Sequence, residues 1–155
     1  MVGILNVTPD SFSDGGRHTT HDAAVRHGLR LHAEGADLVD VDGESTRPGA
    51  HRIPAHEEIR RTAGVVADLV AAGVAVSIDT TRRVVAEAAV AAGACVVNDV
   101  SGGRAEPQMR RFVAEAGCGF VLMHWRAPSR SMARFAVYDD VVAEVRDEIA
   151  RSVDL

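Results

Sequence analysis

The chain contains no lysine. All 17 of its positive residues are arginines, and 22 acidic residues outnumber them, which gives a net charge of −5. Because the arginines are scattered between acids and form no basic patch, the sequence argues against nucleic acid as a partner. No apolar run approaches the ~20 residues of a membrane span, and the first residues are typical of a strand rather than of a signal peptide. We therefore expect a cytoplasmic protein that binds no membrane.

Cysteine is also scarce. Cys95 and Cys118 each stand at the start of an apolar run, a position typical of a small buried side chain rather than of a disulfide or a metal ligand. The chain has 155 residues, of which 46% are hydrophobic and 25% are charged. These values are ordinary for one soluble domain with a core of its own.

One pattern recurs five times, namely a short apolar run that ends on polar residues. It predicts strands at 2–6, 38–41, 74–78, 95–98 and 119–123. Segments of helical period lie between and after them, at 23–34, 55–72, 82–92, 108–116 and from 139 to the end. The first helix is expected to start at His21 or Asp22, after a long loop over 7–20. Strands and helices thus alternate along the whole chain.

This alternation predicts right-handed crossovers and a parallel sheet. The carboxyl ends of parallel strands meet at one edge, where α/β proteins hold their ligands. We expect one ligand site there, formed by the polar residues at or just after the strand ends, namely Asn6, Glu44, Asp79, Asn98 and His124. The first β-to-α turn lacks the GxGxxG fingerprint of doubly wound nucleotide folds. An α/β barrel is therefore favoured, although a complete one needs about 250 residues.

The runs GILNVTPDSFSDGG, GESTRPGA, SIDT, VNDVSGG and LMHWR, in this order and spacing, resemble dihydropteroate synthase, a folate-pathway enzyme family that sulfonamides inhibit. The resemblance covers residues 1–155 and implies a partial TIM (β/α)8 barrel with parallel strands 1–5 and their helices. It implies a truncated pterin-binding domain, because the DPG and SRK stretches of the family's later half have no counterpart here. We expect this fragment alone to be inactive.

The activity that the resemblance implies is the transfer of an alkyl group. The family condenses 6-hydroxymethyl-7,8-dihydropterin diphosphate with 4-aminobenzoate to give 7,8-dihydropteroate and pyrophosphate, with Mg²⁺ on the diphosphate. By the same resemblance Asn6 is the metal ligand, Asp79 and Asn98 bind the pterin ring, and Met123 packs against it. Taken alone, Asn6 would cap the following turn, Asp79 would cap the next helix, and His124 would be held by contacts outside the site.

Two loops of the family also match. The resemblance assigns the first loop Ser11, Phe12 and Asp14, and the second loop Thr46, Arg47 and Pro48. It implies that the loops close over the pterin, with Asp14 stabilising the ring cation that forms when pyrophosphate leaves and Arg47 stabilising the diphosphate. Phe12 and Pro48 would supply apolar walls for the benzoate ring. Each of the six, taken alone, would be a solvated loop residue.

Besides the missing later half, two features depart from the family, and alternative functions stay open. Asp42 stands where the family has Gly, and we expect its charge to crowd or tilt the second loop. Trp125 and Ala127 replace the usual Met and Gly and are expected to be tolerated. Alternative functions are another pterin-binding barrel, such as a methyltetrahydrofolate methyltransferase, and a non-catalytic pterin-binding or assembly module. The resemblance is compatible with a homodimer of the full-length enzyme.

Overall fold

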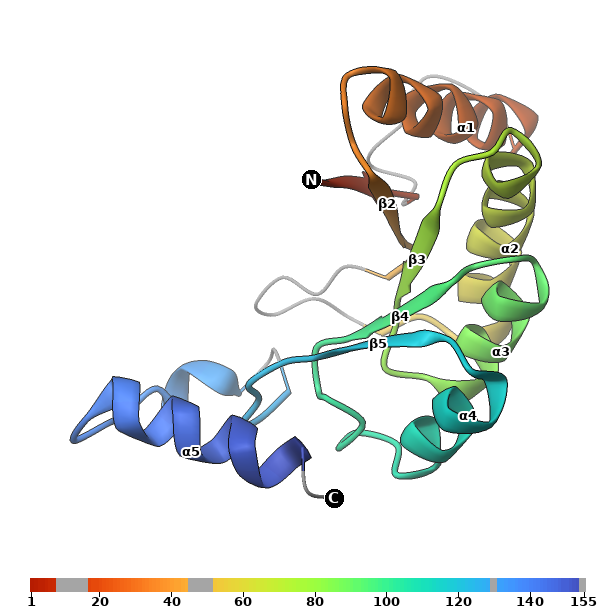
Figure 1. Cartoon of the computed structure of the whole chain (residues 1–155). Coiled ribbons are helices and arrows are strands. Elements are labelled where there is room, and N and C mark those ends of the chain that lie inside the picture. The colour runs from red at the N-terminus through yellow and green to blue at the C-terminus, as the bar shows by residue number, and fades with distance from the viewer. Residues whose placement is uncertain (8–16, 45–51, 129–130, 154–155) are drawn as a thin grey trace.

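The computed structural model describes residues 1–7, 17–44, 52–128 and 131–153. Five parallel strands form one sheet in the order β1-β2-β3-β4-β5, with bounds β1 Val2–Asn6, β2 Leu38–Asp42, β3 Val76–Asp79, β4 Val96–Asp99 and β5 Gly119–Leu122. The helices are α1 Arg17–Ala33, α2 Ala55–Ala71, α3 Arg83–Ala91, α4 Gln108–Ala116 and α5 Val141–Val153, with a short 3₁₀ helix, η2 Met132–Phe135. Figure 1 shows α1 to α4 side by side along one face of the sheet, and α5 apart from them, beyond the carboxyl end of β5.

The order of the strands decides between the two architectures that the sequence allows. It follows the chain without reversal, and α1 to α4 all cover the same face (Figure 1). A doubly wound sheet reverses its strand order and carries helices on both faces, whereas a (β/α)8 barrel winds in one direction with all helices outside. The structure therefore confirms the partial barrel.

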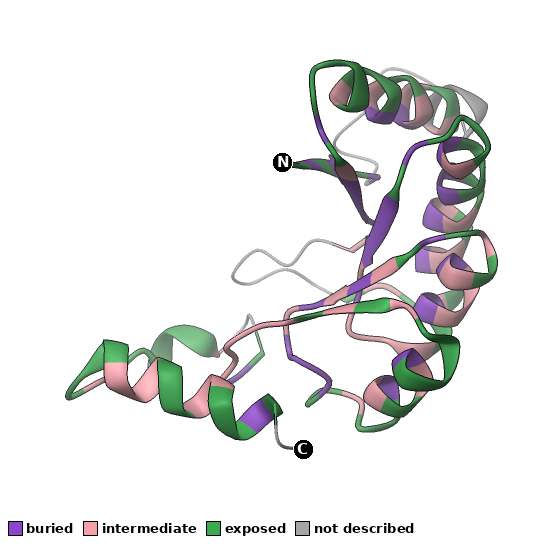
Figure 2. Ribbon diagram, in the orientation of Figure 1, coloured by how far each residue is buried: buried purple, intermediate pink, exposed green. Residues whose placement is uncertain are grey.

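The core lies between the sheet and these helices, where Figure 2 shows most of the buried residues. In β1 the exposure alternates, so that Leu5 is fully buried against the helices while Val2 and Ile4 are 55% and 65% exposed on the other face. Helices α1 and α2 pack closely at Gly28 of α1, where the absence of a side chain makes room for Leu69 of α2. A Cβ at Gly28 would come within 2.7 Å of Leu69 Cδ2. The uncovered face of the sheet is the inner face of the partial barrel.

Several predicted boundaries were wrong by a few residues. Helix α1 begins at Arg17 rather than at His21 or Asp22, because no glycine or proline after the Gly15-Gly16 pair interrupts a helix there. Strand β3 begins at Val76 rather than Val74, because the Val74 N–H donates 3.0 Å to the carbonyl of Leu69 and so completes the end of α2. The 3₁₀ helix η2 was not predicted.

The cysteines agree with the prediction only in part. Cys95 and Cys118 are both free, as expected. Cys118 is half-buried, but Cys95 is exposed, so its predicted burial was wrong; it directly precedes β4 and its thiol lies 3.5 Å from the Val76 carbonyl. Among the described residues, no helix is both long and apolar enough to cross a membrane.

Candidate ligand site at the carboxyl ends of the strands

A row of four polar side chains crosses the carboxyl ends of β1 to β4. The register pairs Asn6 with Asp42, Asp42 with Asp79, and Asp79 with Asn98. Side chains alternate between the two faces of a strand, so these register partners share one face, the inner one on which Asn6 is exposed. The predicted convergence of Asn6, Asp79 and Asn98 at one edge is confirmed, and Asp42 joins them.

A second row lies two residues earlier on the same strands. The register runs from Ile4 to Asp40, Ser77 and Val96. Asp40, only 8% exposed, accepts a 2.6 Å hydrogen bond from the Ser77 hydroxyl at Oδ1 and a 2.8 Å bond from Asn98 Nδ2 at Oδ2. Asp40 and Ser77 therefore support the first row from below. The sequence analysis missed both, although polar residues at alternate positions of DVD and SID indicate an inner face.

Two acceptor atoms of the first row have no donor in the part of the chain that the structure describes. Asp79 Oδ1 and Asn98 Oδ1 are buried and have no hydrogen-bond partner among the described residues. Burial, helped by the negative charges of Asp42 and Asp40, raises the pKa of the Asp79 carboxyl to about 8. A buried acceptor without a donor is costly, so this part of the row is suited to a ligand that brings N–H groups.

The structure contradicts the alternative that Asp79 caps the following helix. At the start of α3, the N–H of Arg82 donates to Thr80 Oγ1 at 3.2 Å and the N–H of Arg83 donates to Glu106 Oε2 at 2.7 Å. Two of the N–H groups at the start of the helix are thus bound by side chains other than Asp79. The Asp79 carboxyl is thus left to the inner face of the sheet.

Asp42 adds a second carboxyl beside Asp79. It is 6% exposed, and burial raises its pKa to about 7, against the lowering effect of a hydrogen bond from the backbone N–H of Glu44. That bond is 2.9 Å long and ends on Asp42 Oδ1. The side chain turns back onto its own backbone in the manner of an Asx turn. Whether it tilts the second loop stays a prediction, since 45–51 lies outside the described residues.

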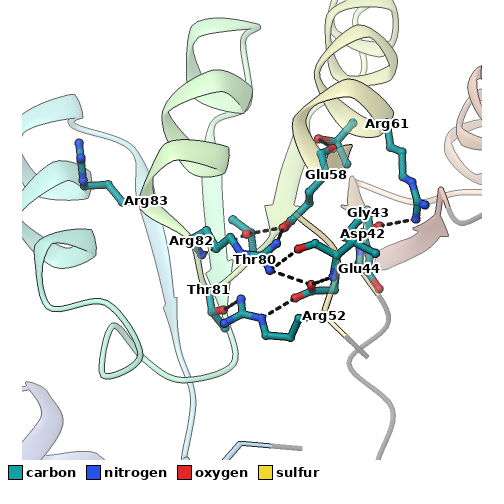
Figure 3. A network of polar contacts seen from close by, with 12 residues as sticks. Asp42, Gly43, Glu44, Arg52, Glu58, Arg61, Thr80, Thr81, Arg82 and Arg83 are labelled. Atoms are coloured by element: carbon teal, nitrogen blue, oxygen red, sulfur yellow. Dashed lines mark hydrogen bonds and ion pairs between the residues drawn. The ribbon is translucent and has the colours of Figure 1, made fainter. Parts of the chain in front are cut away.

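Glu44 was predicted to belong to the row, but its carboxylate is instead bound in a polar network beside it (Figure 3). Glu44 Oε1 accepts from the backbone N–H of Ile53 at 2.8 Å and from Arg82 Nη2 at 3.0 Å. Glu44 Oε2 accepts from Arg52 Nε at 3.1 Å, and Arg52 Nη2 donates to Thr81 Oγ1 at 2.9 Å. Residues on both sides of segment 45–51 are thereby attached to the turn that follows Asp79.

Arg82 is the centre of this network. Its guanidinium donates to Glu58 and, at 2.6 Å, to the carbonyl of Ile53, besides its bond to Glu44. Glu58 is only 1% exposed and also accepts the Thr80 hydroxyl at 2.6 Å; burial raises the pKa of its carboxyl. Arg82 therefore compensates a buried charge and joins α2, the β3-to-α3 turn and the residues beside the second loop. The sequence pattern predicted Arg82 only as the first residue of a helix.

At β5, His124 has a partner outside the row. Its Nε2 lies 2.8 Å from Glu148 Oε2 on α5, which confirms the alternative that contacts elsewhere hold this histidine. Arg126 also contacts Glu148 and stacks 4.0 Å from the centre of the Tyr138 ring, so this cluster fixes α5. Met123 follows β5 and is half-buried; its packing against a pterin stays a prediction.

The two predicted loops fall outside the described residues. This applies to six candidates of the sequence analysis: Ser11, Phe12, Asp14, Thr46, Arg47 and Pro48. Segment 8–16 follows β1 after Val7, and segment 45–51 follows β2 after Glu44. Both segments thus leave neighbouring strands at the edge of the sheet that carries the row.

Comparison with known proteins connects this geometry to a family. A family model described as pterin binding enzyme matches residues 2–155. The chain is 57% identical to the dihydropteroate synthase of Mycobacterium leprae, over 99% of this chain and 55% of that protein. It is 40% identical to the dihydropteroate synthase of Bacillus subtilis, over 100% of this chain and 52% of that protein.

Solved structures agree with the sequence relatives. A structure of Xanthomonas albilineans dihydropteroate synthase with 4-aminobenzoic acid has a TM-score of 0.87 and 50% identity over 98% of this chain and 53% of its own. Another, in complex with 7,8-dihydropteroate, has a TM-score of 0.81 and 46% identity, over 98% of this chain and 52% of its own. The chain spans about half the length of the relatives that it matches. By its sequence over 2–155 and by its fold, the chain belongs to the pterin binding enzyme family.

Proposed function

We propose that this chain supplies the part of a dihydropteroate synthase active site that strands β1 to β5 form. The reaction joins 6-hydroxymethyl-7,8-dihydropterin diphosphate to 4-aminobenzoate and releases pyrophosphate. The observation that carries the proposal is a pair of buried acceptors, Asp79 Oδ1 and Asn98 Oδ1, on neighbouring strands at the inner edge of the barrel, for which the described part of the chain supplies no donor. The proposal is also supported by dihydropteroate synthase relatives at 57% and 40% identity.

The chemistry of the pterin ring suits these acceptors. The 2-amino-4-oxo edge of the ring offers adjacent N–H donors. The Asp79 carboxylate can accept a hydrogen bond from one of them, and the neighbouring Asn98 amide oxygen can accept from the other. A ligand N–H at Asp79 would form a charge-assisted hydrogen bond, which is stronger than a neutral one. It would also favour the charged form of a carboxyl whose pKa burial raises to about 8. Asp79 and Asn98 would thus bind and orient the ring.

Magnesium is part of the proposal, with Asn6 as its protein ligand. Among the described residues, no three histidine, cysteine or acidic side chains are placed to hold a metal ion. Mg²⁺ does not need such a cage, because it keeps several waters and takes one or two protein oxygens together with phosphate oxygens. Asn6 is exposed at the end of the row and is paired in register with Asp42, and such an oxygen donor fits the ion. When bound, the ion would neutralise charge on the departing diphosphate.

The remaining roles belong to the two loops. We propose that Arg47 stabilises the leaving diphosphate, that Asp14 stabilises the ring cation, and that Thr46 and Ser11 help to bind substrate. Phe12 and Pro48 would form the walls of the 4-aminobenzoate pocket. A cytoplasmic location, a homodimer of the full-length enzyme and sulfonamide inhibition are proposed with the same function.

The test is an assay of the full-length gene product with both substrates and Mg²⁺, in which pyrophosphate and 7,8-dihydropteroate are measured. We expect release that depends on 4-aminobenzoate and falls at least tenfold in Asp79→Ala. Asp68→Ala is the control, because Asp68 is 57% exposed on α2, where it pairs with His21. Pterin binding without release would favour a non-catalytic pterin-binding module. Absence of both would overturn the proposal.

A further inference from the structure

Asp40 has no part in the proposed chemistry, yet it is buried directly behind the ligand site. It lies one layer below the row on the inner face, between Ile4 and Ser77 in register. Both of its oxygens accept hydrogen bonds, Oδ1 from the Ser77 hydroxyl and Oδ2 from Asn98 Nδ2. A carboxylate in this position has donors on both sides.

The contact with Asn98 decides which way the amide of Asn98 faces. An amide group has a donor end and an acceptor end, and a carboxylate can only accept. The Nδ2 end must therefore face Asp40, and the Oδ1 end must face away from it. Asn98 Oδ1 is buried beside Asp79, and none of the described residues donates a hydrogen bond to it. Turning the amide over would set Oδ1 against the Asp40 carboxylate, oxygen against oxygen.

From this geometry we infer that Asp40 is a positioning residue: by fixing the Asn98 amide, it makes the site present two adjacent acceptors and so selects a ring edge with two adjacent N–H donors. The inference rests on the proposed function and names the part of the pterin that the site reads. With the amide turned over, Nδ2 would donate to Asp79 or to the ligand. The site would then accept rings with a carbonyl at that edge.

The chemical class that the site selects is a fused ring with a 2-amino-4-pyrimidinone edge. In a pterin, the 2-amino group and the neighbouring ring N–H are both donors. A lumazine has the same size and shape but carries a carbonyl oxygen in place of the 2-amino group. That oxygen would meet an acceptor in the site. The ratio of the two affinities therefore reports the orientation of the Asn98 amide, whereas a general loss of folding would weaken both ligands together.

The experiment measures affinities for 6-hydroxymethylpterin and 6-hydroxymethyllumazine by calorimetry on the full-length gene product. We expect the wild type to prefer the pterin. Asp40→Asn, which keeps the shape but can donate to Asn98 Oδ1, should lower that preference by roughly two- to tenfold, the range for one hydrogen bond. Ser77→Ala is the matched control, because it removes the other bond to Asp40 and leaves the Asn98 contact in place.

A double-mutant cycle separates positioning from a structural role. If Asp40 acts through Asn98, Asp40→Asn should leave the ratio unchanged when Asn98→Ala is already present. Asp40→Ala is carried in parallel, in case the amide variant folds poorly. An unchanged ratio in both Asp40 variants, or an equal drop in the Asn98→Ala background, would overturn the inference. A wild type that binds neither ring would instead overturn the proposed function.

Discussion

Replacing Asp79 by asparagine should have opposite effects on stability and on ligand binding. The native carboxyl is buried near Asp42 and Asp40, and its pKa is raised to about 8. Because the folded-state pKa lies above the ordinary carboxyl value of 3.8, the folded protein holds this proton more tightly than the unfolded chain. The stability that this proton contributes is complete below pH 3.8 and is lost as the pH rises to about 8. Asparagine has no such loss.

The size of the effect follows from the same shift. At ~1.4 kcal/mol per pKa unit, holding the carboxyl protonated at pH 7 against a solution pKa near 3.8 costs at most roughly 4 kcal/mol. We expect Asp79→Asn to raise the free energy of unfolding at pH 7 by at least about 1 kcal/mol, within that limit. The same change removes the charge that ring N–H groups would meet. Loss of a charge-assisted hydrogen bond costs about 1.5–3 kcal/mol, so pterin affinity should fall at least tenfold.

Urea denaturation at pH 4, 7 and 8.5 measures the first effect, and calorimetry with 6-hydroxymethylpterin measures the second. The gain in stability should be near zero at pH 4 and should increase with pH. Asp68→Asn is the control; it lies 57% exposed on the surface and should change stability by less than about 0.5 kcal/mol. A variant that is less stable than the wild type at pH 8.5, or that binds pterin equally well, would refute the reasoning.

Four further predictions concern other parts of the chain. Pterin binding at pH 7 should release protons, because ring donors lower the Asp79 pKa from about 8, and a binding enthalpy that is the same in phosphate and Tris buffers would contradict this. Arg82→Ala should cost about 3–5 kcal/mol by leaving the buried Glu58 charge uncompensated, and adding Glu58→Gln should recover part of that loss in urea denaturation; full additivity would count against it. Arg47→Ala and Asp14→Ala should lower turnover and leave binding of a plain pterin nearly intact, whereas equal losses in both would remove this division of roles. The 155-residue chain expressed alone should be inactive and should self-associate in sedimentation, because β1 and β5 are the outer strands of its sheet; an active monomer is the contrary result.

The elements and the gathering of the site could be predicted because both depend on local pattern. Apolar runs of four or five residues separated by segments of helical period specify the alternation of strands and helices. Parallel strands bring their carboxyl ends together, which is why Asn6, Asp79 and Asn98 were expected at one edge. The ends of the elements were less predictable. Val74, for example, looks suited to a strand, but its N–H donates to the carbonyl of Leu69 and so completes the end of α2.

The supports of the site depend on contacts that are distant in sequence. Arg82 meets Glu58 and Glu44 across 24 and 38 positions, and no spacing in the chain marks that pairing. Asp40 meets Asn98 across 58 positions. The family resemblance assigns ligand residues and is silent on these supports. For Glu44 the position after a strand was misleading, because the side chain follows the nearest guanidinium groups rather than the inner face.

The measurement that tests the account most directly is a crystal structure of the full-length gene product with 6-hydroxymethylpterin. We predict that the 2-amino and ring N–H groups lie within about 3 Å of Asp79 Oδ1 and Asn98 Oδ1, with Asn98 Nδ2 still donating to Asp40. A ring bound elsewhere, or bound with Asn98 Nδ2 turned toward it, would contradict the account.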